Sequence, residues 1–476
     1  MWVLVGVMGV ATVAWGQDVE SAVCSKCECL YTMPLDVDCT TTMLDQVPDM
    51  TKDIFTVPVN LDLSYNVIHQ VTKFANVPQL VTLLIRKNQV VSIVDEAFKE
   101  LPNLKRLSLQ GNNLTKEALT QNVFIGQHQP NDTHPSPLSL EELDLSYNLL
   151  HSLDSHAFLH LPYLKRLFFS NNPVRDISFG MATAINELSA LEELDLSQTG
   201  IERLPDHFLS DLRHLKILTL AGNKFSSVPS TELNFAHSLQ ELNLNANPIT
   251  RIDVGDFPEG LASLRVLGLS ALPRLRSVGQ QAFSNIAGLQ VLRLSDNPSF
   301  AVIDEKAFMV LPDTDLALEE IHLQNNHLST LSEKMLPWLD LRLVDLQNNP
   351  WDCDCRAKWI AETLIPDLED KNPQTTLSIL CANPLSDRGM KMVDLLEHSH
   401  TFQCVAPDPF VRHEGRYGPL IIGTIVVGTL LLLTGTLAFV IILYRRTQEN
   451  QLFGERVKYR RAQEEEEEGV AHTVHS

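Results

Sequence analysis

The sequence has no cysteine between Cys39 and Cys353, so no disulfide can cross-link the centre of the chain. It also lacks the motifs Gly-x-Ser-x-Gly, His-Glu-x-x-His, Gly-x-Gly-x-x-Gly and a phosphate-binding loop, and so gives no sign of a hydrolase, zinc protease, dinucleotide enzyme or NTPase. Its histidines are scattered, and we expect no metal site even at the closest group, His151, His156 and His160. We therefore expect neither catalysis nor a cofactor.

Basic residues are scarce. The chain has 37 Lys and Arg against 59 Asp and Glu, a formal net charge of −22. Such a balance repels nucleic acid, so we expect no nucleic-acid partner. Two explanations stay open for the acidic surface: it keeps the protein soluble, or it attracts a basic protein partner.

Two segments lack charged side chains altogether. Residues 1–16 are apolar, and Ala14 and Gly16 are the small residues that precede a signal-peptide cut before Gln17, although no Lys or Arg precedes them. Residues 420–443 form an apolar run long enough to span a bilayer as a helix. The basic pair Arg445 and Arg446 follows and marks the cytoplasmic side. We predict a single-pass type I protein of the cell membrane with an extracellular ectodomain.

What the sequence has in abundance is one repeated pattern, Leu-x-x-Leu-x-Leu-x-x-Asn. Clear copies are Leu104, Leu107, Leu109 and Asn112, and Leu140, Leu143, Leu145 and Asn148. The alternating middle part of each copy predicts a short strand, and the asparagine can bond backbone groups at the turn that follows. About twelve copies predict an α/β repeat solenoid with one long curved surface. Residues 115–139 lengthen one repeat and, because they are rich in proline, we expect a loop there.

The eight cysteines lie in two groups of four, one at each end of the repeats: Cys24, Cys27, Cys29 and Cys39, and Cys353, Cys355, Cys381 and Cys404. The spacings Cys24-x-x-Cys27 and Cys353-x-Cys355 are compatible with zinc ligands as well as with disulfides. The predicted export signal favours disulfides, because the extracellular space is oxidising.

The segment Asn349-Pro350-Trp351-x-Cys353-Asp354-Cys355, followed by Trp359, resembles the C-terminal flank of extracellular leucine-rich repeat proteins with cysteine-rich caps. The resemblance covers roughly residues 24–404. It implies a leucine-rich repeat horseshoe closed by disulfide caps. In that family the first cysteine of the C-terminal flank pairs with the third and the second with the fourth, which implies Cys353–Cys381 and Cys355–Cys404. The N-terminal flank implies Cys24–Cys29 and Cys27–Cys39.

These features divide the chain into seven predicted segments: signal peptide 1–16, N-terminal cap 17–57, repeats 58–349, C-terminal cap 350–405, stalk 406–419, membrane helix 420–443 and cytoplasmic tail 444–476. We expect no signalling domain in a tail of this length. Asn113-Leu114-Thr115 and Asn131-Asp132-Thr133 are acceptor sites for N-glycosylation.

The third, fifth and seventh residues of each repeat should point out of the curved sheet, so the ligand-binding candidates come from these positions. They form an early charged group, Arg106, Glu142, Asp144, Arg166, Phe168, Glu193 and Asp195, and a later smooth group around Val266 and Val291. Opposite charges on neighbouring strands could equally pair with each other as a self-satisfied ladder.

We expect from this a non-catalytic cell-surface receptor or adhesion protein that binds an extracellular or cell-surface protein on its concave face. The protein could also bind a co-receptor or form a homodimer. One alternative is an accessory subunit or co-receptor that modulates a channel or a growth-factor pathway in the same membrane. Another is an innate recognition receptor that has no signalling domain of its own.

Overall fold

The computed structural model describes residues 22–127, 135–310, 315–397, 402 and 435–446, which fall into two units, Met1–Cys404 and Val405–Ser476. In the second unit, residues 435–446 are helical. Among the described residues, no helix combines the length and the hydrophobicity that crossing a bilayer requires. The predicted signal peptide and most of the predicted membrane helix and tail lie outside the described residues.

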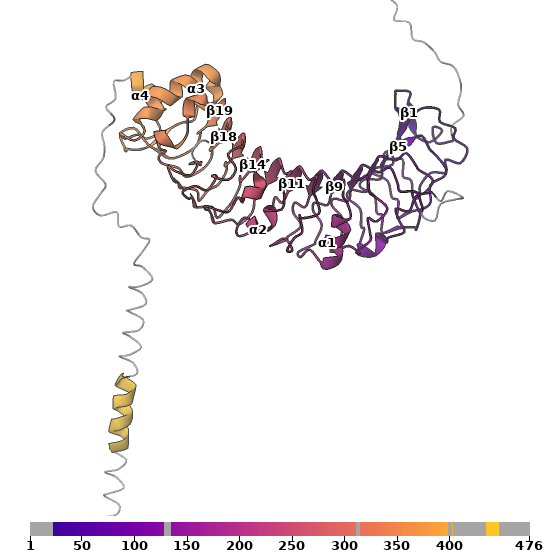
Figure 1. The fold of residues 1–476 in the computed structure, drawn as a ribbon, viewed down its shortest axis with the longest axis horizontal. Helices are drawn as coiled ribbons and strands as arrows, with labels where there is room; N and C mark the ends of the chain where they lie inside the picture. Colours follow the sequence, from indigo (N-terminus) through magenta and orange to yellow (C-terminus); the bar gives the residue numbers. More distant parts are fainter. Residues whose placement is uncertain (1–21, 128–134, 311–314, 398–401, 403–434, 447–476) are drawn as a thin grey trace, which may run out of the picture. The chain divides into compact units, whose positions relative to one another are not determined.

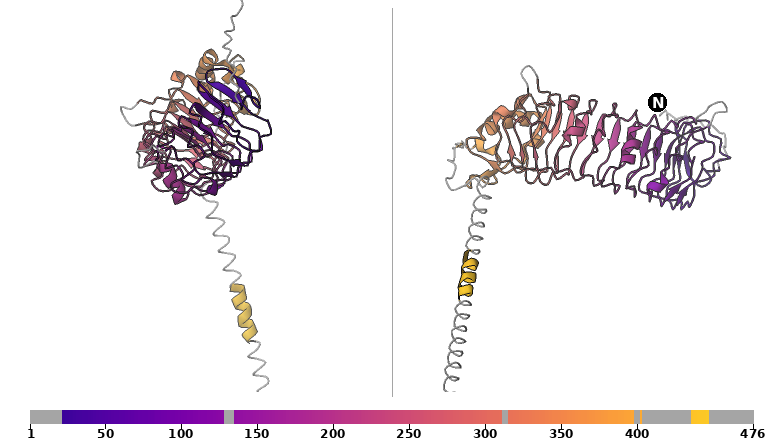
Figure 2. Two further views of the ribbon diagram at one scale, coloured as in Figure 1. Left: turned by 90° about the vertical axis from the view of Figure 1, so that its right-hand side faces the viewer. Right: turned by 60° about the horizontal axis from the view of Figure 1, so that its bottom comes forward.

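The first unit is a solenoid whose short strands form one 14-stranded sheet along the inner side of an arc (Figure 1). From the N-terminal end the strands are β1 (Glu28–Leu30), β2 (Leu35–Asp38), β3 (Val59–Asp62), β5 (Leu80–Leu84), β7 (Arg106–Ser108), β8 (Glu142–Asp144), β9 (Arg166–Phe168), β10 (Glu193–Asp195), β11 (Ile217–Thr219), β12 (Glu241–Asn243), β14 (Val266–Gly268), β16 (Val291–Arg293), β18 (Glu320–His322) and β19 (Leu343–Asp345). The strands from β2 onward are parallel and stack like rungs (Figure 2), as the repeated pattern predicts.

Shorter elements lie on the outer side of the arc and in the C-terminal cap. They are α1 (Phe179–Asn186), α2 (Ser230–Leu233), α3 (Ile365–Lys371), α4 (Asp394–Glu397), the short helices η1 (Lys116–Ala118), η2 (Glu259–Leu261), η3 (Glu333–Met335), η4 (Trp338–Asp340), η5 (Ile360–Leu364) and η6 (Pro373–Thr375), and the strands β4 (Gln70–Val71), β6 (Ser92–Ile93), β13 (Arg251–Ile252), β15 (Ser277–Val278), β17 (Val302–Ile303), β20 (Trp351–Asp352) and β21 (Cys381–Asn383). Neighbouring strands of a sheet lie only about 4.8 Å apart, so the sheet takes the shorter, inner side of the arc and the outer segments, most of them turns, take the longer side.

The core is built from the repeat leucines. Leu104, Leu107 and Leu109 are almost completely buried, as are their counterparts along the solenoid. Phenylalanines line the outer part of the core: Phe74, Phe98 and Phe124 stack with ring centroids 6.1 and 5.9 Å apart. Burying a side chain of this size contributes about 1.5–3 kcal/mol each, so the stacked repeats stabilise one another.

Residues 115–139 have the irregular backbone that the prolines predict, apart from η1 and the undescribed residues 128–134, yet part of this loop is buried in the core. Leu119, Val123 and Phe124 are fully buried, and the Phe124 ring lies 6.3 Å from that of Phe158. This inserted segment therefore supplies one layer of the outer core. Only residues 128–134, which include the predicted glycosylation site Asn131, lie outside the described residues.

Asparagine side chains connect successive repeats. Asn148 accepts a hydrogen bond from the Leu114 backbone N–H and donates to the carbonyl oxygens of Leu109, in the previous repeat, and Leu145, in its own repeat. Equivalent bonds run through most of the solenoid, so each turn satisfies backbone groups of the turn before it. Thr199 replaces the asparagine in one repeat and donates through its hydroxyl, whereas Leu272 in another offers no such donor.

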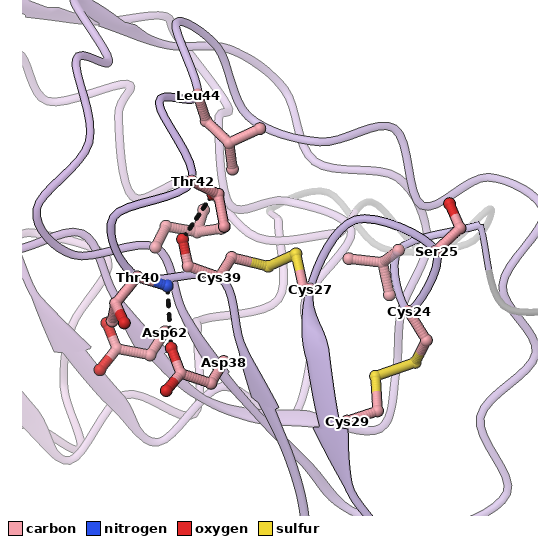
Figure 3. Close-up of a disulfide and its surroundings, with 12 residues drawn as sticks. Cys24, Ser25, Cys27, Cys29, Asp38, Cys39, Thr40, Thr42, Leu44 and Asp62 are labelled. Carbon is pink, nitrogen blue, oxygen red and sulfur yellow. Dashed lines mark hydrogen bonds between the residues drawn. A yellow bond between two sulfur atoms is a disulfide. The ribbon is translucent and has the colours of Figure 1, made fainter.

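Residues of the two caps close the ends of this asparagine ladder. In the N-terminal cap the Thr42 hydroxyl donates to the Cys39 carbonyl oxygen, which also accepts from Asn66 of the first repeat (Figure 3). In the C-terminal cap the Trp351 Nε1–H donates to the Leu346 carbonyl oxygen, where a further repeat would have placed its asparagine. The caps therefore cover the apolar core and also complete the hydrogen bonding of the terminal repeats.

The cap disulfides match the pairing implied by the family resemblance. The structure contains Cys24–Cys29, Cys27–Cys39 and Cys353–Cys381 (the first two in Figure 3). Cys355 is also disulfide-bonded, and its expected partner Cys404 lies outside the described residues. The zinc alternative is therefore wrong for the cysteines that the structure describes.

Candidate functional site

The inner face of the sheet presents the third and fifth residues of each repeat in two rows. In β9, β10 and β12 the middle residue is buried while its two neighbours are only partly buried. Because the strands are parallel and in register, the third-position residues Arg106, Glu142, Arg166 and Glu193 form one row, and the fifth-position residues Asp144, Phe168 and Asp195 form the next. The structure thus brings the whole early group of predicted residues together on one face.

Glu142 is held between two arginines. Its Oε1 lies 2.7 Å from Arg106 Nε, and its Oε2 lies 2.8 Å from Arg166 Nη2. Glu142 is only 8% exposed, while both arginine side chains reach into solvent. Since both carboxylate oxygens are occupied, these three residues form the self-satisfied ladder, and Glu142 contributes little free charge to a ligand.

The ladder ends at Arg166. Glu193 is the next residue in the row, yet among the described residues no ion pair includes it, because Arg166 binds Glu142 instead. Burial raises the pKa of the Glu193 carboxyl; the nearby carboxylates of Asp195, Glu142 and Glu241 act in the same direction, and Arg166 opposes them. A cation placed beside Glu193 would relieve this unfavourable environment.

The fifth-position aspartates have a structural role that the sequence pattern did not reveal. Each accepts a hydrogen bond from the backbone N–H two residues later: Asp62 from Ser64, Asp144 from Ser146 and Asp195 from Ser197, at 2.8, 3.0 and 2.8 Å. The bond fixes the chain as it leaves the strand.

Asp144 and Asp195 differ in whether their second carboxylate oxygen is hydrogen-bonded. The second oxygen of Asp144 accepts from the Ser108 hydroxyl, whereas both bonds to Asp195 reach its Oδ1. The Oδ2 of Asp195 therefore has no hydrogen bond within the described part of the chain and can face a ligand.

Phe168 is an aromatic side chain in this row of acids. It lies in register with Asp144 on one side and Asp195 on the other and is partly exposed. Aromatic side chains on a protein surface are enriched among the residues that dominate binding energy. Phe168, Glu193, Asp195 and Glu241, which we call the Phe168 patch, combine an apolar surface with carboxylates that no cation among the described residues neutralises.

The later candidates, Val266 and Val291, are neighbours on β14 and β16 and are partly buried. The expected smooth surface is interrupted, because Arg293 in the fifth row is exposed beside the buried Gly268. The Ser270 and Ser295 hydroxyls bond each other at 3.0 Å and so offer less to a ligand. This region is weaker as an apolar contact surface than the sequence predicted.

Sequence reasoning missed several charged residues of the same rows. Glu241 stands in the third row, and toward the C-terminal end Glu320, His322 and Asp345 face one another on β18 and β19. Burial lowers the pKa of His322, Arg293 lowers it further and Asp345 opposes both. Counting each repeat position through to the last repeat would have found all of these residues.

The remaining predicted sites are on other surfaces. Asn113 is exposed beside the turn asparagine Asn112. His156 Nδ1 lies 2.8 Å from Glu187 Oε1 on the outer side of the arc. Within the ranges that the structure describes, no three His, Cys, Asp or Glu side chains are placed to hold a metal.

Two family models match this chain. The model described as "Leucine rich repeat" matches residues 78–126, 138–191 and 189–249, and the "BspA type Leucine rich repeat region (6 copies)" model matches residues 235–349. Together they span more than half of the 476 residues.

Similar proteins include Tsukushi from Gallus gallus, 31% identical over 211 residues, which are 44% of this chain and 54% of that protein. Lumican from Gallus gallus is 28% identical over 257 residues, which are 53% of this chain and 68% of that protein. The chain thus matches about half of the length of Tsukushi. Among solved structures, the chain is similar to one titled "Crystal structure of TLR13-ssRNA13 complex", which covers 71% of this chain and 53% of its own at 20% identity and a TM-score of 0.48.

Proposed function

Because this chain belongs to the leucine-rich repeat family, in which the stacked repeats form one extended inner face, we propose that it is a non-catalytic cell-surface protein that binds a protein ligand at the Phe168 patch. The observation that carries the proposal is the end of the charge ladder at Arg166. Beyond this residue the inner face holds Glu193, Asp195 and Glu241 without a neutralising cation among the described residues.

This geometry favours one kind of ligand surface. A Lys or Arg side chain would bind the carboxylates of Glu193 and Asp195, and an apolar neighbour of that residue would cover Phe168. The raised pKa of Glu193 means that its charge is poorly stabilised in the free protein, so pairing with a cation is favourable. Charge complementarity of this type speeds association and selects against acidic competitors.

We also propose that the chain is anchored in the cell membrane by residues 420–443. The supporting observations are the absence of any charged residue in this run and the basic pair Arg445 and Arg446 that follows. In the described helix 435–446, the side chains of Leu437, Phe439 and Val440 are 59–63% exposed, so no described residue buries them. Resistance of the full chain to alkaline extraction from membranes would support this anchoring, and release would contradict it.

The test of ligand binding starts with a screen of the secreted ectodomain against cell-surface and secreted proteins. For a ligand found in this way, we expect Phe168→Ala to weaken binding about 10- to 100-fold, the range of an interface hot spot. Charge reversal by Glu193→Lys and Asp195→Lys should weaken it further. The matched control is Asp211→Lys, which makes the same charge change at an exposed residue outside the sheet.

Three outcomes separate the alternatives. Loss of binding in the patch variants, with normal secretion and an unaffected control, supports the proposal. Unchanged affinity in all patch variants excludes the Phe168 patch as the binding surface. If replacing residues 420–446 abolishes activity on a membrane partner while the patch variants remain active, the accessory-subunit alternative holds instead.

A further inference from the structure

One edge of the inner face carries a row of residues with left-handed backbone conformation. The eighth residue of each repeat has a positive φ, for example 58° at Tyr65, 52° at Lys87, 70° at Gly111 and 56° at Tyr147. This conformation suits glycine and asparagine and disfavours bulky side chains. A tyrosine at this position therefore adds strain, yet Tyr65 and Tyr147 point their rings largely into solvent, at 61% and 51% exposure.

The ring of Tyr147 is held in place from two repeats away. The Lys87 ammonium lies over it, 5.1 Å from the ring centroid. To reach it, the Lys87 side chain crosses Gly111, where a Cβ atom would lie only 2.8 Å from Lys87 Cδ. The absence of a side chain at Gly111 thus allows a cation–π contact that orders this edge.

Asn113 follows Gly111 by two residues. Its backbone N–H donates to Val90 in the previous repeat, and the neighbouring Leu114 carbonyl accepts from Leu149 in the next repeat. Asn113 and Leu149 occupy the same repeat position in adjacent turns, which are about 4.8 Å apart, and both are exposed; Tyr147 lies two residues before Leu149 in the same turn. Leu149 is itself 51% exposed, so an apolar surface that nothing in the described chain covers lies beside a glycosylation acceptor.

We propose that Asn113 carries an N-linked glycan whose first sugar, an N-acetylhexosamine, packs on Tyr147 and Leu149. The Asn113 side-chain nitrogen would form a bond to the anomeric carbon of a lipid-diphosphate oligosaccharide while the bond to the diphosphate breaks and the nitrogen loses a proton. The apolar C–H face of the sugar then covers the ring face that Lys87 leaves free. The glycan shields this edge of the early repeats from protein ligands, which therefore bind at the inner face.

This inference rests on the extracellular location in the proposed function but not on the Phe168 patch. The test expresses the full chain in animal cells and measures two quantities by mass spectrometry: occupancy of Asn113, and the rate at which an N-glycanase removes that glycan from the native protein. The variant Tyr147→Asn removes the ring and keeps a residue that tolerates positive φ. The matched control is Tyr65→Asn, which makes the same change in the same Asp-Leu-Ser-Tyr-Asn context, two repeats from Asn113.

We expect Asn113 to be glycosylated in the wild type and in Thr115→Ser, and unmodified in Thr115→Ala. Tyr147→Asn should raise the rate of glycan release about 2- to 10-fold, the factor that loss of one aromatic contact gives, and Tyr65→Asn should leave it unchanged. The inference is overturned if the exported protein is unmodified at Asn113, or if wild type and Tyr147→Asn release the glycan equally fast. It is also overturned if, in the Thr115→Ala background, Tyr147→Asn abolishes binding of a protein ligand, because this edge would then be a protein-binding surface. Each of these results leaves the role of the Phe168 patch unaffected.

Discussion

Replacing Asn148 by alanine tests how far the asparagine ladder stabilises the solenoid. Asn148 is 4% exposed, and its side-chain amide donates to the carbonyl oxygens of Leu109 and Leu145 at 3.0 Å each and to that of Ser146 at 3.2 Å. Its Oδ1 accepts from the Leu114 backbone N–H at 3.1 Å. Alanine removes all four bonds at once.

The four bonds do not contribute equally. The carbonyl oxygens of Leu109 and Leu145 keep a second amide donor, from Asn112 at 2.8 Å and Asn172 at 2.9 Å. Among the described residues the Leu114 N–H has no other hydrogen bond, and a buried donor left without a partner costs about 1–3 kcal/mol. With about 1 kcal/mol for the weakened carbonyl contacts, Asn148→Ala should lower the free energy of unfolding by about 2–4 kcal/mol.

The assay is denaturant unfolding of a secreted form, residues 17–404, together with amide hydrogen exchange at Leu114. The control is Asn103→Ala, which removes one exposed hydrogen bond, to the Pro78 carbonyl oxygen at 2.9 Å, and should cost about 0.5 kcal/mol. We expect exchange at Leu114 to accelerate only in Asn148→Ala. If both variants lose the same stability and Leu114 stays protected, the argument from the unpaired donor is refuted.

Two further predictions concern the inner face. Glu142→Gln should free Arg166 to pair with Glu193 and so weaken binding of a basic ligand about 3- to 10-fold, measured by surface plasmon resonance. The free energy of unfolding should change by about 1 kcal/mol or less, because Arg106 and Arg166 are both well exposed. Affinity for that ligand should also fall as the pH is lowered through the raised pKa of Glu193, because the ligand binds the charged carboxylate, and this pH dependence should be flatter in Glu193→Gln. The free energy of unfolding of the free protein should change in the opposite direction. Because the pKa of Glu193 is raised in the folded state, its charged carboxyl destabilises the fold at pH values above that pKa. This penalty disappears as the pH falls through the raised pKa.

The repeat pattern was sufficient to predict the strands, the inward leucines and the rows on the inner face. A side chain at a given repeat position has the same environment in every turn, so Leu107 and Leu143 could be assigned to the core from spacing alone. The pattern fails where the repeats end, because Thr42 and Trp351 are not asparagines and yet complete the asparagine ladder. Their roles depend on which carbonyl oxygen each one reaches, and a linear pattern does not contain that information.

The charge ladder shows a second limit of the sequence. Arg166 lies between Glu142 and Glu193 in register, and alternating signs predicted pairing on both sides. The structure selects one side, because Glu142 is more deeply buried and a buried carboxylate needs its partners more than an exposed one does. Relative burial of two equivalent positions depends on the packing around them, so only the structure could identify Glu193 as the acid without a partner.

This difference decides how acidic residues on the inner face should be tested. Charge reversal of Glu142, Asp144, Glu193 and Asp195 together would mix two effects, since the oxygens of Glu142 and Asp144 are all bonded within the sheet, whereas Glu193 and the Oδ2 of Asp195 have no bonds to the described residues. Reversal at the first two should reduce stability because it leaves arginines or backbone groups unpaired. Reversal at Glu193 should act on the ligand alone, whereas reversal at Asp195 also removes the bonds that its Oδ1 accepts from Ser197, so Glu193 is the position that measures the binding surface most directly.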